Sequence, residues 1–151
     1  MKLAIAAALS HHPQLLVLDE ATSGLDPIMR DEMLDVFLDF VQDERHSILL
    51  SSHITSDLEK IADYITFIHN GRLILSAMKD DLRYNYGVMR CSENQFQALN
   101  QEDMMAYLKR DYQVDVLLSD SKAAQRKYKD AVIDHVSIDE IMLLLIKGER
   151  I

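Results

Sequence analysis

Two carboxylates and one histidine occupy positions from which they could act on a phosphate group. Asp19 and Glu20 follow the apolar run 15–18, and His53 follows a second apolar segment, 47–51. Four apolar residues without polar alternation are typical of a strand covered on both faces in a parallel α/β sheet, and such sheets bind ligands at the carboxyl ends of their strands. A cation on a phosphate would compensate the acidic pair, although such a pair also fits an ordinary helix start.

The segment Ser-Gly-Leu-Asp-Pro, residues 23–27, predicts a tight turn leading into a helix. Gly24 can adopt a positive φ, Asp26 can cap the helix, and Pro27 suits its first position. Apolar residues then recur at helical spacing from Ile28 to Val41. Taken with the preceding strand and acidic pair, this string closely resembles the Walker B strand and D-loop of ATP-binding-cassette (ABC) ATPases.

The position of His53 in the sequence favours a functional role. A single histidine is commonly a hydrogen-bonded structural residue, but His53 ends the strand that follows the first strand–helix unit. The two strand ends should therefore lie side by side at one sheet edge. The segment Ser-Ser-His-Ile resembles the switch-histidine motif of ABC ATPases. We expect the other histidines to be structural or surface residues: His11, His12, His46, His69 and His135.

The resemblance implies an ATPase site that works with ATP and Mg²⁺. It implies that Asp19 holds Mg²⁺ through water, that Glu20 is the general base, and that His53 contacts the γ-phosphate and orients Glu20. It further implies a D-loop that crosses a dimer interface, formed by Ser23, Gly24, Leu25 and Asp26. The implied partners are a second ATPase subunit, in a homodimer or heterodimer, and a separate membrane permease. The implied location is cytoplasmic, peripheral on the inner face of the membrane.

The expected fold is α/β: the C-terminal half of a P-loop NTPase domain, with parallel strands and flanking helices, followed by a small α+β extension. An Ala-rich helix at 1–9, a helix opened by a capping box at 56–59, and a hairpin over 65–76 with an Asn-Gly turn belong to the first part. We place that part at residues 1–84 and an accessory extension at 85–151. The extension resembles that of bacterial exporter-type subunits. It includes a strand-like segment at 114–118 and, better defined, a helix opened by a capping box at 137–140.

The sequence also lacks motifs that the family requires. Its four glycines include no Gly-Lys pair, so the phosphate-binding G-x-x-x-x-G-K-[ST] loop is absent, and no signature motif is present. We therefore expect a C-terminal fragment that is inactive alone. Its sheet and its first helix should lack part of their cover, which would expose apolar side chains; the helix residues concerned are Leu3, Ile5, Ala6 and Leu9.

Composition limits the remaining function classes. The net charge of −9, with 25 acidic and 16 basic residues, argues against a nucleic-acid surface. The single cysteine excludes an internal disulfide, and no apolar run approaches the ~18 residues of a membrane span. Two alternatives stay open: a helicase-type or DNA-acting ABC-type ATPase fragment, and a non-catalytic interaction module.

Overall fold

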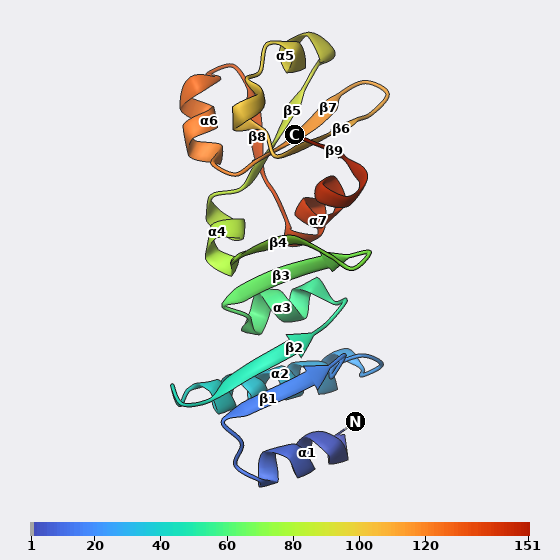
Figure 1. Cartoon of the computed structure of the whole chain (residues 1–151), viewed down its shortest axis with the longest axis vertical. Coiled ribbons are helices and arrows are strands. Elements are labelled where there is room, and N and C mark those ends of the chain that lie inside the picture. Colours follow the sequence, from blue (N-terminus) through green and yellow to red (C-terminus); the bar gives the residue numbers. More distant parts are fainter. Residues whose placement is uncertain (1) are drawn as a thin grey trace. The chain divides into compact units, whose positions relative to one another are not determined.

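The computed structural model describes residues 2–151 and shows a mixed α/β protein (Figure 1). The chain divides into two compact units, Met1–Ala62 and Asp63–Ile151. The functional boundary expected after residue 84 stays a prediction, because compactness does not define what a segment does. Met1 of the expected first helix lies outside the described residues.

The first unit is a strand–helix–strand arrangement with a helix at each end. Its elements are α1 (Lys2–Ser10), β1 (Leu15–Asp19), α2 (Pro27–Val41), β2 (Ser47–Ser51) and α3 (Thr55–Ile61). Strands β1 and β2 are parallel, in a register that pairs Leu15 with Ser47 and Asp19 with Ser51. The expectation that the two strand ends lie side by side is therefore confirmed.

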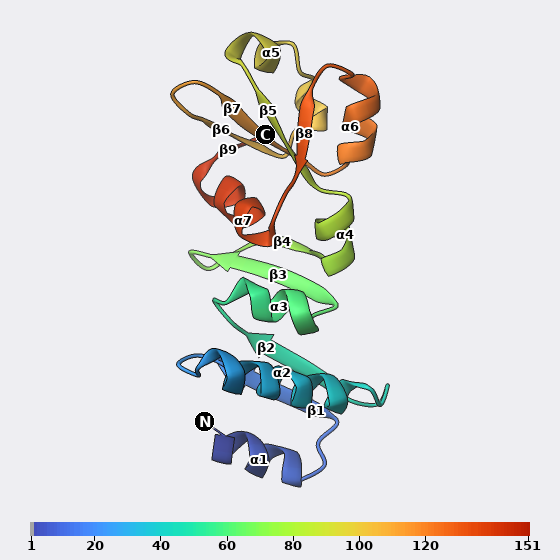
Figure 2. The ribbon, with the colours of Figure 1, turned by 180° about the vertical axis from the view of Figure 1, so that it is seen from behind.

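The core of the first unit lies on one face of this two-stranded sheet. Phe37 of α2 is fully buried, and Ile5 of α1 packs in the same cluster. Figure 2 shows α2 lying across β1 and β2. On the other face Leu15, Val17 and Leu49 are 56%, 67% and 63% exposed.

The prediction that β1 is covered on both faces is therefore wrong for residues 2–151, because the helices in this part of the chain cover only one face. The expected exposure of apolar side chains is confirmed on the bare sheet face and at Leu3. It is wrong for Ile5, which is 5% exposed because it packs in the cluster with Met33, Leu34 and Phe37 of α2.

The second unit begins with the expected hairpin. Strands β3 (Tyr64–His69) and β4 (Arg72–Met78) are antiparallel and are joined at Asn70-Gly71. Both turn residues have positive φ, 49° and 72°, as a type I′ turn requires. Helix α4 (Lys79–Tyr84) follows directly.

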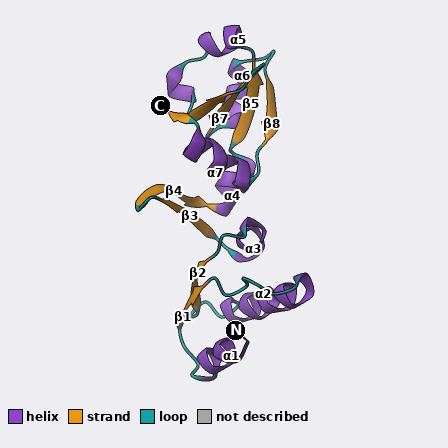
Figure 3. Ribbon diagram, turned by 90° about the vertical axis from the view of Figure 1, so that its right-hand side faces the viewer, coloured by secondary structure: helices purple, strands orange, loops and turns teal. Residues whose placement is uncertain are grey.

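The rest of the second unit is a five-stranded antiparallel sheet, in the order β8-β5-β7-β6-β9, with its helices. Figure 3 shows β5, β7 and β8 of this sheet. The strands are β5 (Gly87–Cys91), β6 (Ala106–Lys109), β7 (Val114–Leu118), β8 (Val132–His135) and β9 (Glu149–Arg150). The helices are α5 (Glu93–Gln97), the 3₁₀ turn η1 (Gln101–Asp103), α6 (Ser121–Lys127) and α7 (Ile138–Lys147). The expected strand at 114–118 and the helix after Ser137 are confirmed. Of the capping box expected at 137–140, the described residues form one bond, from the Glu140 N–H to the Ser137 hydroxyl oxygen.

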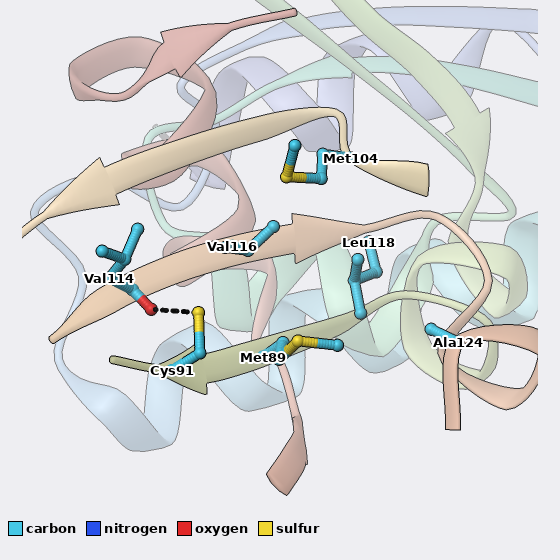
Figure 4. Close-up of a cluster of buried hydrophobic side chains, with 7 residues drawn as sticks. All are labelled: Met89, Cys91, Met104, Val114, Val116, Leu118 and Ala124. Carbon is cyan, nitrogen blue, oxygen red and sulfur yellow. Dashed lines mark hydrogen bonds between the residues drawn. The ribbon is translucent and has the colours of Figure 1, made fainter. Parts of the chain in front are cut away.

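Side chains of the central strand β7 point alternately to the two faces of the sheet, and each face has its own apolar core. Val116 and Leu118 join Met89, Met104 and Ala124 on one face (Figure 4), while α7 packs against β6 and β7. Cys91 lies in the first of these cores, where its thiol donates a hydrogen bond to the Val114 carbonyl over 3.6 Å. Burial raises the pKa of this thiol, which makes Cys91 a structural residue rather than a nucleophile.

Every helix in residues 2–151 is too short or too polar to cross a membrane.

Gly148 is required by crowding rather than by its φ of −79°. A Cβ atom there would lie 2.4 Å from the Leu144 carbonyl oxygen and 2.6 Å from that of Tyr107, and backbone atoms cannot move aside cheaply. We expect Gly148→Ala to lower the free energy of unfolding by about 1–3 kcal/mol, the usual cost of overpacking. Urea unfolding followed by circular dichroism measures this, with the exposed neighbour Lys147→Ala as control. Equal stability of the two variants would contradict the crowding argument.

Candidate active site

The parallel pair β1–β2 brings the segments that carry Glu20 and His53 to one sheet edge. Beyond the last paired residues, Asp19 and Ser51, the Glu20 backbone N–H donates to the Ser51 carbonyl oxygen over 3.0 Å. The residues after each strand therefore leave the sheet together. This places the Glu20 side chain opposite the segment that carries His53.

Glu20 and His53 form a direct hydrogen bond. His53 Nδ1 lies 2.6 Å from Glu20 Oε2, and the two side chains are 68% and 39% exposed, respectively. An ionised carboxylate can only accept hydrogen bonds, so Nδ1 must carry the shared proton when Glu20 is charged. The pair is thus open to solvent on a rim where a ligand could reach both groups.

The backbone of Glu20 is held in an uncommon conformation. Its φ is +50°, in the left-handed region that non-glycine residues seldom adopt, and the Ser23 N–H donates to its carbonyl oxygen over 3.0 Å. Such conformations cost about 1–3 kcal/mol and persist where surrounding contacts enforce them, often at functional sites. The strain turns the chain sharply as soon as β1 ends.

Asp19 lies beside Glu20 on the exposed face of the sheet. The Ser51 hydroxyl donates a hydrogen bond to Asp19 Oδ1, a contact that the sequence interpretation missed. Among residues 2–151 no cluster of three or more acidic, histidine or cysteine side chains could hold a metal ion. One exposed carboxylate fits Mg²⁺ of the kind held mainly by water and substrate phosphates, rather than by a protein cage.

The turn after Glu20 has the geometry that its sequence predicts. Gly24 has a φ of +74°, and Asp26 accepts hydrogen bonds from the Ile28 and Met29 N–H groups at 3.1 and 3.0 Å. Pro27 begins α2. The Arg30 guanidinium donates to the Leu25 carbonyl oxygen over 3.4 Å. The turn is therefore fixed to the start of α2, and it leaves Gly24 and Asp26 exposed.

Helix α3, which follows His53, begins differently from the expected capping box. It starts at Thr55, its N-cap is Ile54, and no side chain caps it, so the predicted box at residues 56–59 is wrong. Asp57 instead turns inward and accepts a hydrogen bond from the Thr22 hydroxyl over 2.6 Å. The sequence interpretation missed both partners; an acidic residue in a first helical turn gives no local sign of burial.

An ion-pair cluster also fixes α3 to α2. Lys60 Nζ lies 2.7 Å from carboxylate oxygens of both Asp31 and Asp35. The hydrogen bonds to Asp31 and then Asp35 raise the pKa of Lys60, which stays charged at neutral pH. These ion pairs link α3, the helix after His53, to α2, the helix after the Ser23–Asp26 turn.

Among the other histidines, His46 has the contacts of a structural residue. His46 Nδ1 is 3.1 Å from the Phe40 carbonyl oxygen, and its ring stacks on that of Phe40. This agrees with the structural role expected for it. The remaining four are exposed: His11, His12, His69 and His135.

No protein-family model matches the chain. A bacitracin transport ATP-binding protein of Bacillus licheniformis is 42% identical over 82 residues, which are 54% of this chain and 27% of that protein. A lantibiotic transport ATP-binding protein of Streptococcus pyogenes is 44% identical over 79 residues, 52% of this chain and 34% of that protein. An energy-coupling factor transporter ATP-binding protein of Ligilactobacillus salivarius is 36% identical over 81 residues, 54% of this chain and 28% of that protein. The chain thus spans about a third of the length of these curated relatives, or less.

Proposed function

We propose, from the finding that its curated homologues over about half of its length are ABC transporter ATP-binding proteins, that this chain is part of such a subunit. The subunit would couple ATP hydrolysis to transport through a separate membrane permease. The observation that carries the proposal is the 2.6 Å hydrogen bond between Glu20 and His53 at the ends of adjacent parallel strands. This arrangement supports the proposal, because α/β sheets bind their ligands at the carboxyl ends of their strands.

In the proposed mechanism Glu20 acts as the general base. It would accept the proton of the attacking water on Oε1, since Oε2 is bonded to His53. His53 would hold the carboxylate through its Nδ1–H, and its other ring nitrogen, when protonated, would donate a hydrogen bond to a γ-phosphate oxygen. The exposure of both groups supports this role, because water and nucleotide must reach them together.

Asp19 is the residue proposed to hold Mg²⁺. The Ser51 hydroxyl fixes Oδ1 and so orients the carboxylate, which leaves Oδ2 for a metal-bound water. When bound, Mg²⁺ would neutralise charge on the β- and γ-phosphates.

The turn Ser23–Asp26 is proposed to contact a second ATPase subunit, identical or related. Its exposed Gly24 and Asp26, together with its fixed geometry, support a role in contact rather than in chemistry. We further propose that residues 1–84 are the C-terminal part of a P-loop ATPase domain and that 85–151 are an accessory extension. The permease would hold the subunit on the cytoplasmic face of the membrane.

A test of this function supplies the phosphate loop that the 151 residues do not contain. The chain, co-expressed with the N-terminal half of a related cassette ATPase, should hydrolyse ATP in the presence of Mg²⁺ and lose this activity in EDTA. Phosphate release measures the rate, and the N-terminal half alone is the control. A co-purified complex that neither binds nor hydrolyses ATP would contradict the ATPase proposal and favour a non-catalytic interaction module.

A further inference from the structure

Two polar side chains of the first unit are buried together outside the proposed catalytic pair. Thr22 and Asp57 are 0% and 2% exposed, and the Thr22 hydroxyl donates to Asp57 Oδ2 over 2.6 Å. Thr22 lies in the turn after β1, and Asp57 lies in the first turn of α3. The bond therefore joins two segments 35 residues apart.

Because Asp57 is buried, its carboxylate depends on this hydrogen bond. None of the ion pairs within residues 2–151 involves Asp57, and the side chain that compensates its burial is the Thr22 hydroxyl, which donates to it. A buried carboxylate that loses a hydrogen-bond donor cannot recover by turning to water. The pair therefore strongly favours the one arrangement of turn and helix in which the bond forms.

The two partners lie close in sequence to the catalytic pair. Thr22 is two residues beyond Glu20, and Asp57 is four residues beyond His53. The pairing of β1 with β2 ends at Asp19 and Ser51, and the bond from the Glu20 N–H to the Ser51 carbonyl oxygen extends the alignment to Glu20 but not to His53. Ala21 packs in one cluster with Ile61 of α3, but apolar packing tolerates small shifts that a short buried hydrogen bond does not.

We propose that the Thr22–Asp57 bond is a positioning device that holds Glu20 and His53 within hydrogen-bond distance. The inference deepens the proposed function and rests on it for the meaning of the Glu20–His53 pair. That pair is exposed, and exposed ion pairs contribute little to their own order. The parallel strands bring the two segments together, and the buried bond sets the fine geometry of the exposed pair.

The test measures the Glu20–His53 contact directly, without nucleotide, in the 151-residue chain. The His53 ring nitrogen resonances are recorded by NMR at a fixed pH, and Glu20→Ala, which removes the acceptor, defines the displacement that loss of the contact causes. Thr22→Val removes only the hydroxyl donor, and it should produce about half of that displacement or more, because the buried carboxylate must then rearrange. Thr22→Ser keeps the donor and should return the resonances close to their parental positions.

Two internal controls separate positioning from general destabilisation. The His46 ring, held on Phe40 in the same unit, should not respond to Thr22→Val. The matched variant Thr66→Val removes an exposed hydroxyl that is bonded to Ser76 and should leave His53 unchanged. If Thr22→Val does not fold, Asp57→Asn replaces it: this variant keeps an acceptor without the charge and should give a smaller displacement in the same direction.

A Thr22→Val chain that is less stable but has parental His53 resonances overturns the inference, because the bond would then be structural only. Glu20→Ala resonances equal to the parental ones also overturn it, since no contact would exist to be positioned. Neither result depends on ATP hydrolysis. Failure of the inference is thus distinct from failure of the proposed function, which the ATPase assay of the complex decides.

Discussion

Glu20→Gln, in a complex that contains the missing phosphate loop, should keep ATP binding and reduce turnover by about 10²-fold or more. The amide has the shape of the carboxylate and can still contact His53, but it cannot accept a proton from the attacking water. The nucleotide would be held mainly by the phosphate loop, so its affinity should change little.

His53→Ala should give a loss of similar size for a different reason. Glu20 keeps its basicity in this variant but loses the hydrogen bond that fixes its orientation. Single-turnover phosphate release and equilibrium nucleotide binding, measured on the same preparations, separate turnover from affinity. Glu59→Gln, an exposed carboxylate on α3, is the matched control and should behave as the parent. A parental rate in either test variant would show that its assigned role is wrong.

The chain alone should show neither tight ATP binding nor hydrolysis above background. Backbone N–H groups and the lysine of a phosphate loop supply most of the grip on the β- and γ-phosphates, and the sequence contains no such loop. The acidic pair Asp19 and Glu20 would repel a nucleotide, and one carboxylate with water makes a weak Mg²⁺ site. Calorimetry with Mg-ATP measures this, and micromolar affinity of the chain alone would falsify the prediction.

The same chain should also associate with itself. Leu15, Val17 and Leu49 lie side by side on the uncovered sheet face, and apolar surface of this kind favours self-association. Co-expression with the N-terminal half of a related cassette should relieve both defects together, because one interface would complete the phosphate site and cover this face. Light scattering and calorimetry on the same samples test the link. Restored nucleotide binding with unchanged self-association would contradict it.

Local rules of the sequence determined the elements that carry the chemistry. The apolar runs predict both strands of the parallel pair. Asp26 and Pro27 predict the start of α2, and Asn70-Gly71 predicts the hairpin turn. Each depends on neighbours a few residues away, whose propensities act before any tertiary contact forms. The meeting of Glu20 with His53 followed as well, because successive parallel strands end at one edge.

Tertiary structure alone decided which polar groups are buried and which apolar groups are not. The sequence predicts Asp57 as part of a helix cap. Its side chain is buried instead, because the hydroxyl of Thr22, 35 residues away, donates a hydrogen bond to it. Edge strand β8 and the two-residue strand β9 exist only through pairing with β5 and β6. Val17 is 67% exposed although its neighbours predict a covered strand, since cover must come from distant segments. A local sequence pattern specifies the preferred backbone conformation and which side chains tend to be buried. The residues that bury them are selected by the packing of the whole unit.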